Sequence, residues 1–176
     1  MRWFTRFSRC IYTSPSGYKV YDNFFYRWLT LDSSVLQTVI FKKRPQRPIL
    51  YYLPALTLMV KARPGPSCLL GLGGAGVIQY LSPYRAEITA VDNSEEVIYI
   101  AQKYFMPNSL RNVTTVHQSA ELYLEQCPIK YDHLLIDLYN AQSFPPECNN
   151  EHFFLHCANR LQENGFMAIN LANPKE

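Results

Sequence analysis

The stretch Cys68-Leu-Leu-Gly-Leu-Gly-Gly-Ala-Gly76, followed by Glu87-Ile-Thr-Ala-Val-Asp92, decides the fold that this sequence predicts. The first segment has the pattern of a short buried strand that runs into a glycine loop. The second has the pattern of another apolar strand, and it ends in a carboxylate. Gly71, Gly73 and Gly76 match the spacing G-x-G-x-x-G, in which the backbone approaches a ligand closely before a helix begins. The pattern favours a site for an adenosine-bearing ligand.

Asp92 strengthens this interpretation because it ends the second strand about twenty residues after Gly71. A carboxylate at that place can accept hydrogen bonds from both hydroxyls of a ribose. A structural turn at the glycines and a helix-capping role for Asp92 form the alternative. The predicted nucleoside-binding residues are Gly71, Gly73, Gly74, Gly76, Asp92 and Asn93.

Strands alternate with helices along the rest of the chain, from about Cys68 to Leu171. This alternation predicts a Rossmann-like α/β fold, with a mainly parallel sheet and helices on both faces. Asn164-Gly165 is expected to cap the last helix. The expected elements are a helix at Val77–Leu81, a helix at Ser94–Phe105, a strand at Val113–His117, a helix to about Gln126, a strand at Tyr131–Asp137, a helix at about Glu151–Glu163 and a strand at Phe166–Leu171.

Residues 1–62 are expected to form a small β-rich segment with a linking helix, and residues 63–176 the Rossmann-like domain. Pro64-Gly-Pro66 marks the boundary between them. Residues 1–17 are expected to be irregular. Strand-like runs follow at about Tyr18–Tyr21, Phe25–Leu31 and Leu36–Phe41, with a helix over about Ile49–Val60.

The composition excludes several classes of protein. Hydrophobic residues make up 48% of the 176 residues and the formal net charge is +3, which is too small for a dedicated nucleic-acid binder. No apolar stretch approaches the ~20 residues that span a membrane. The five cysteines form no CxxC pair, which is typical of reduced core thiols in a cytoplasmic protein.

Asp137 follows the apolar run Leu134-Leu-Ile136 at the end of a predicted strand. In parallel sheets the ligand crevice lies at the carboxyl ends of the strands, so this carboxylate could act as a general base or hold a cation. A loop-capping aspartate is the alternative. Tyr139, Asn140 and Gln142 are predicted to line the same crevice as substrate-binding residues.

No metal site is predicted. His152 and His156 are four residues apart on a predicted helix, but the sequence places no third ligand beside them.

Several segments between Tyr18 and Leu171 resemble motifs of the spermidine synthases and their short relatives, which have the S-adenosylmethionine-dependent methyltransferase fold. The resemblance covers most of the chain, and its specificity comes from the whole set of motifs. The segments are Leu31-Asp-Ser-Ser-Val-Leu-Gln37, similar to LDGxxQ, then Leu53-Pro54, Leu69–Gly76, Ala90–Asp92, Ile100–Phe105, Tyr131–Asp137 and Phe144-Pro-Pro146.

The resemblance implies a decarboxylated S-adenosylmethionine donor and a diamine acceptor, with S-adenosylmethionine and methylthioadenosine as related ligands. Gln37 would contact the donor, and Asp92 would bind the ribose. Ser119 stands where the family has the residue that receives the adenine amino group. Asp137 would take a proton from the attacking amine, because an ammonium cannot attack.

Three positions depart from the family pattern. Gly74 stands in place of an acidic anchor for an ammonium, Ser119 in place of an acidic adenine-binding residue, and Asn140 in place of a second aspartate. Because diamines carry two positive charges, these changes keep three hypotheses open. The chain is a spermidine synthase-like transferase, a catalytically degenerate binding or assembly module on the same fold, or a small NAD-binding protein.

The sequence ends at Glu176, just past the fifth predicted strand, where methyltransferase-type folds normally continue. We therefore expect a C-terminally shortened domain. Its last strand would be an exposed edge unless a partner covers it, which predicts a homodimer.

Overall fold

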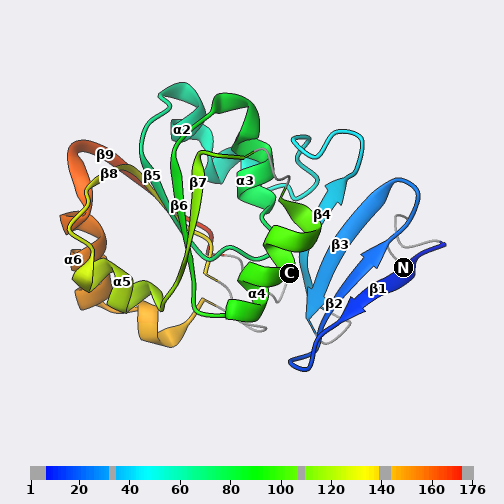
Figure 1. Ribbon diagram of the computed structural model, residues 1–176. Coiled ribbons are helices and arrows are strands. Elements are labelled where there is room, and N and C mark those ends of the chain that lie inside the picture. Colours follow the sequence, from blue (N-terminus) through cyan, green and yellow to red (C-terminus); the bar gives the residue numbers. More distant parts are fainter. Residues whose placement is uncertain (1–6, 32–34, 107–109, 139–143, 172–176) are drawn as a thin grey trace.

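The computed structural model describes residues 7–31, 35–106, 110–138 and 144–171, and its strands form two sheets (Figure 1). The first sheet is antiparallel, with the order β1-β2-β3-β4, and the second is parallel, with the order β7-β6-β5-β8-β9. The first comprises β1 (Arg9–Thr13), β2 (Tyr18–Asp22), β3 (Tyr26–Leu31) and β4 (Val35–Phe41). The second comprises β5 (Ser67–Leu70), β6 (Ile88–Asp92), β7 (Val113–His117), β8 (Tyr131–Ile136) and β9 (Leu161–Ile169).

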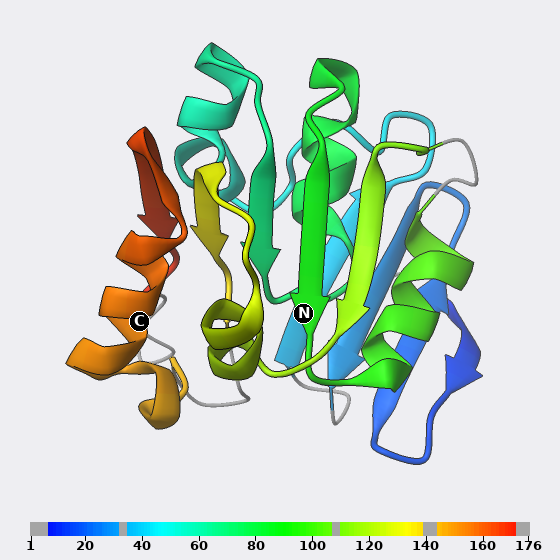
Figure 2. The same cartoon turned by 60° about the vertical axis from the view of Figure 1, so that its left-hand side comes forward.

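Helices cover both faces of the parallel sheet, which confirms the predicted fold class (Figures 1 and 2). Three short segments, η2 (Ser82–Tyr84), the π-helical η3 (Ala101–Phe105) and η4 (Pro146–Cys148), complete the described elements. One face carries α1 (Leu53–Leu56), α2 (Leu58–Ala62), α3 (Gly76–Leu81) and α4 (Glu95–Ile100), and the other carries α5 (Ala120–Gln126) and α6 (Glu151–Asn159).

The central strand β5 shows why this sequence forms a two-faced sheet. Successive side chains of a strand point to opposite faces, and all four residues of β5 are buried. Leu69 packs in the cluster that contains Ile78 of α3, whereas Leu70 packs in the cluster that contains Leu124 of α5. The short apolar run is therefore a strand covered on both faces.

Helix α4 begins after a polar cap. The Ser94 hydroxyl oxygen accepts a hydrogen bond from the Val97 N–H at 3.2 Å, and Glu95 and Glu96 follow in the first turn. Side-chain capping and acidic residues both stabilise a helix N-terminus. Ser94 is therefore the N-cap of α4.

Three expected boundaries were wrong. Residues 9–13 form strand β1, which pairs with β2, although residues 1–17 were expected to be irregular. The helix expected over Ile49–Val60 begins only at Leu53 and is divided into α1 and α2. Helix α6 ends at Asn159, and Asn164-Gly165 lies inside β9 instead of capping that helix. Pairing with neighbouring strands decides both strand boundaries.

The N-terminal sheet packs against the α/β unit, with β4 close to α3 (Figure 1). Leu29 of β3 belongs to the same buried cluster as Val77 and Ile78 of α3. The Arg27 guanidinium also donates a hydrogen bond to the Tyr104 carbonyl oxygen at 2.8 Å. The N-terminal sheet is therefore held as a wall beside the carboxyl ends of the parallel strands.

The register aligns those carboxyl ends. Leu70 of β5 pairs with Val91 of β6 on one side and with Ile136 of β8 on the other. Each partner immediately precedes an aspartate, so Asp92 and Asp137 lie on either side of the glycine loop. The sequence positions chosen for chemistry thus meet at one edge of the sheet.

Strand β9 lies at the edge of the parallel sheet and exposes Phe166 and Met167. The expected homodimer stays a prediction. No helix within the described part of the chain is long and apolar enough to cross a membrane.

Candidate functional site

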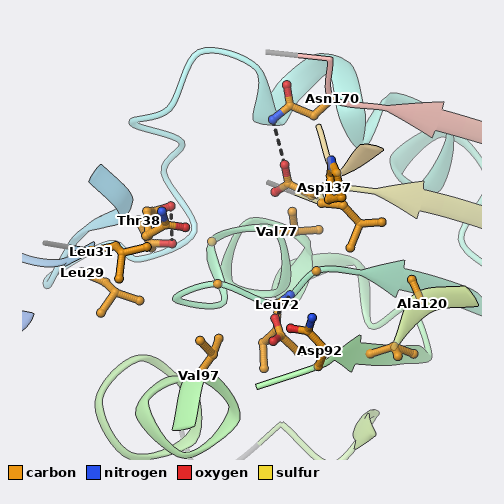
Figure 3. Close-up of a pocket in the computed structure, with 18 of the residues that line it drawn as sticks. Leu29, Leu31, Thr38, Leu72, Val77, Asp92, Val97, Ala120, Asp137 and Asn170 are labelled. Atoms are coloured by element: carbon orange, nitrogen blue, oxygen red, sulfur yellow. Dashed lines mark hydrogen bonds between the residues drawn. The ribbon is translucent and has the colours of Figure 1, made fainter. Parts of the chain in front are cut away.

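A cavity of about 750 Å³ opens between the glycine loop, the carboxyl ends of β6 and β8, and the N-terminal sheet (Figure 3). This volume suits a nucleoside-sized ligand. Tyr139, Asn140 and Gln142 lie outside the described residues. Gly74, a predicted binding residue, is buried beside the cavity and is not part of its wall. The predicted residues that do line the cavity are Gln37, Gly71, Gly73, Gly76, Asp92, Asn93, Ser119 and Asp137.

The Asp92 carboxylate accepts hydrogen bonds from two backbone N–H groups. Its Oδ2 accepts a hydrogen bond from the Leu72 N–H, and its Oδ1 accepts one from the Ser94 N–H, both at 2.9 Å. Burial raises the pKa of the Asp92 carboxyl, while the hydrogen bonds from Leu72, Ser94 and Gly73 act in the opposite direction. Each carboxylate oxygen has a second lone pair, so Asp92 can hold the loop and still accept ribose hydroxyls.

Asp137 has a donor on each oxygen. The Tyr52 hydroxyl donates to Oδ2 at 3.0 Å, and the Asn170 amide donates to Oδ1 at 2.8 Å (Figure 3 shows the Asn170 bond). Burial raises the pKa of the Asp137 carboxyl, and these two hydrogen bonds lower it again in part. Burial also raises the pKa of Tyr52, which therefore stays a donor. The carboxylate is held in one orientation at the cavity wall.

The cavity beyond Asp92 ends at the start of α5 and at η4. The Ser119 hydroxyl oxygen accepts a hydrogen bond from the Leu122 N–H at 3.3 Å, and so it serves as the N-cap of α5. The Cys148 thiol donates to Glu121 Oε1 at 3.4 Å. Burial raises the pKa of Cys148 to about 12, so its thiol is protonated at neutral pH. Glu121 and Glu147 are the acidic groups at this end.

The opposite end of the cavity is apolar. It lies against the N-terminal sheet, where Leu29 and Leu31 face the glycine loop and Val97 of α4 closes the floor (Figure 3). The lining also includes Leu36 and Leu50, together with Tyr18, Tyr51 and Tyr52.

Three residues of the site were missed from the sequence. Thr38 accepts the Gly74 N–H, and Tyr52 and Asn170 bind Asp137. A signal for Asn170 was present, because it is a polar residue that directly follows a strand beside β8. Placing the end of that strand at Leu171 hid this signal.

Comparison with known proteins supports one family. No protein-family model matches the chain. A polyamine aminopropyltransferase from Neisseria meningitidis is 26% identical over 150 residues, which cover 82% of this chain and 57% of the relative. A probable spermidine synthase from Corynebacterium glutamicum has a TM-score of 0.76 at 18% identity, over 90% of this chain and 62% of that protein. The chain is similar in sequence to polyamine aminopropyltransferases and in structure to spermidine synthases, which supports a spermidine synthase-like family.

Two further solved structures share the fold of this chain. A spermidine synthase in complex with the transition-state analogue AdoDATO has a TM-score of 0.68 at 19% identity, over 90% of this chain and 57% of that protein. A SAM-dependent methyltransferase from Archaeoglobus fulgidus has a TM-score of 0.55 at 17% identity, over 70% of this chain and 52% of that protein. The chain thus has a methyltransferase-type fold, and it spans between half and two thirds of the length of these proteins.

No cluster of three or more metal-ligating side chains occurs among residues 7–171 outside the gaps in the described structure. His152 and His156 contact each other on α6, with 3.1 Å between their Nε2 atoms.

Gly71 of the glycine loop should tolerate no side chain. Its φ is +92°, and a Cβ there would lie 2.4 Å from the Asp137 carbonyl oxygen. Left-handed backbone strain and overpacking together are expected to lower the free energy of unfolding of Gly71→Ala by about 2–5 kcal/mol. Chemical denaturation measures this loss.

Gly76→Ala is the matched control, because a Cβ at Gly76 would meet no atom closer than 3.7 Å. Gly76 also begins α3, where alanine is favoured over glycine by roughly 0.5–1 kcal/mol. Equal stability of the two variants would contradict the close approach described at Gly71.

Proposed function

We propose that this chain is a spermidine synthase-like transferase that binds an S-adenosylmethionine-type nucleoside and transfers an aminopropyl group to an amine. One observation carries the proposal. Asp92, at the end of β6, and Asp137, which follows β8, lie on the two strands that flank β5, and both face one cavity from either side of the glycine loop. On this proposal one carboxylate binds a ribose and the other accepts a proton.

The residues present fit such a nucleoside. Gly73 and Gly76 line the cavity, and a Cβ on either would meet its nearest neighbour only at 3.6 Å or beyond. The backbone there is open to a ligand without a side chain in between. Ser119, Glu121 and Cys148 lie at the far end, where they can contact an adenine.

The chemistry required of the protein is limited. When bound, a decarboxylated sulfonium donor supplies an activated carbon: the amine nitrogen bonds to it while the carbon–sulfur bond breaks, and the electron pair stays on sulfur as a thioether. Asp137 takes the proton that the amine gives up. Tyr52 and Asn170 fix the orientation of that carboxylate.

A catalytically degenerate binding module is the second candidate. The observation that favours it is that both oxygens of Asp137 already accept a hydrogen bond from the protein. On this alternative the nucleoside binds and no group is transferred.

A thermal-shift panel followed by a turnover assay tests the proposal. S-adenosylmethionine, decarboxylated S-adenosylmethionine, methylthioadenosine and NAD are tested separately, because a ligand that binds only the folded state raises the melting temperature. We expect shifts with the sulfur nucleosides and release of methylthioadenosine when the decarboxylated donor and an amine are both present. Absence of any nucleoside shift would exclude the proposal, while a shift without turnover would support the binding module.

A further inference from the structure

We infer that the acceptor of the proposed transfer is a monoamine with an apolar body, and not a diamine. This inference rests on the proposed function and names the substrate class of the same site. It starts from the apolar end of the cavity, where Leu29 and Leu31 lie opposite Val97 (Figure 3).

Among the described residues that line the cavity, the carboxylates lie away from its apolar end or already have an assigned partner. Glu121 and Glu147 belong to the other end of the cavity, and the proposed function assigns Asp92 to the ribose hydroxyls. Asp137 is the remaining carboxylate of the described lining, and it binds Tyr52 and Asn170. It can serve one amino group.

Gly74 cannot supply a second carboxylate in this arrangement. Thr38 of β4 occupies the space in front of it, and a Cβ at Gly74 would lie 2.6 Å from the Thr38 Cβ. The Thr38 Oγ1 accepts the Gly74 N–H at 3.0 Å and donates to the Gln37 carbonyl oxygen at 2.8 Å. A neutral, buried hydroxyl thus fills the space into which a side chain on Gly74 would have to extend.

These contacts determine how many positive charges of an acceptor the cavity can balance. A diamine brings one amine to Asp137 and a second, distal ammonium toward the leucines. An ammonium that leaves water without a carboxylate partner loses hydration that apolar side chains cannot replace. A methyl group at the same position would instead gain from burial. The cavity therefore favours an acceptor with one amine.

Isothermal titration of n-pentylamine and 1,4-diaminobutane tests this directly. The two amines have the same chain length, and they differ in a terminal methyl group against a terminal ammonium. The titrations use protein saturated with methylthioadenosine, so that the nucleoside part of the site is filled. We expect n-pentylamine to bind at least roughly tenfold more tightly than 1,4-diaminobutane.

Thr38→Asp and Thr38→Asn form a matched pair that locates the cause. Both side chains have the same shape and offer an oxygen to the Gly74 N–H, but only aspartate restores a negative charge at the apolar end. Thr38→Asp should shift the preference toward 1,4-diaminobutane by roughly tenfold or more, and Thr38→Asn should keep the wild-type preference.

The outcomes separate this inference from the function on which it rests. Equal or tighter binding of 1,4-diaminobutane by the wild-type protein overturns the monoamine inference and leaves the nucleoside site intact. Binding of neither amine, while methylthioadenosine binds, overturns it as well. Failure of methylthioadenosine to bind overturns the proposed function, and the inference falls with it.

Discussion

Asp137→Asn is expected to reduce the rate of transfer by a factor on the order of 10² to 10⁴ while nucleoside binding persists. The asparagine has nearly the shape of the aspartate, but it cannot take a proton from the attacking amine. Tyr52 and Asn170 can still contact the new side chain. Turnover and the methylthioadenosine thermal shift, measured on the same preparation, separate the two effects.

Asp132→Asn is the matched control. Asp132 lies on the same strand, β8, and it is not among the residues that line the cavity. The transfer rate of the Asp132→Asn variant should stay close to that of the wild-type protein. A comparable loss of rate in both variants would show that the Asp137 effect is not specific to the cavity.

The pH dependence follows from the raised pKa of Asp137. The carboxylate accepts a proton only when it is ionised, so the transfer rate should fall as the pH is lowered through that raised pKa. The contribution of Asp137 to the free energy of unfolding depends on pH in the opposite direction from the transfer rate. It is fully present below the unfolded-state pKa of about 3.9 and is lost as the pH rises through the folded-state pKa. Asp137→Asn should therefore gain stability relative to wild type as the pH rises across this window.

Asp92→Asn is expected to weaken nucleoside binding by a factor on the order of 10² to 10⁴, because each of two ribose hydroxyls would lose a charge-assisted hydrogen bond of about 1.5–3 kcal/mol. The asparagine oxygen can keep one of the two backbone contacts, to Leu72 or to Ser94, because its amide nitrogen cannot accept the other N–H. Titration with methylthioadenosine measures the loss.

Ser94→Ala controls for damage to the start of α4. It removes the cap on the Val97 N–H and should cost about 1 kcal/mol of stability. It leaves both Asp92 oxygens in place, so the affinity should change little. If Ser94→Ala weakened binding as much as Asp92→Asn, the direct ribose contact would be wrong.

The parallel sheet could be predicted because its signals are local. The buried run at β5 and the apolar run at β8 lie within single short segments. Strand β1 gave no such signal, because its sequence, Arg-Cys-Ile-Tyr-Thr, is half polar and becomes a strand through pairing with β2. Asn164-Gly165 has the sequence of a helix stop, yet Leu161 and Phe166 on either side of it pair with β8 and keep it within a strand.

The contacts that complete the site could not be read from local sequence. Tyr52 meets Asp137 from 85 positions away, and Thr38 meets the Gly74 N–H across 36. Neither pair has a spacing that any helix or strand rule connects. They meet because the N-terminal sheet packs beside the carboxyl ends of the parallel strands.

That packing ties ligand affinity to the docking of the N-terminal sheet. Thr38 and Leu29 belong to the N-terminal sheet and line the cavity. A molecule in which this sheet is not docked on the α/β unit therefore has an incomplete site. The measured dissociation constant is then the intrinsic constant divided by the docked fraction. Arg27, which bridges the two units without lining the cavity, can set that fraction from a distance. Weakening this remote bridge would lower affinity for every ligand equally, without changing the preference among ligands.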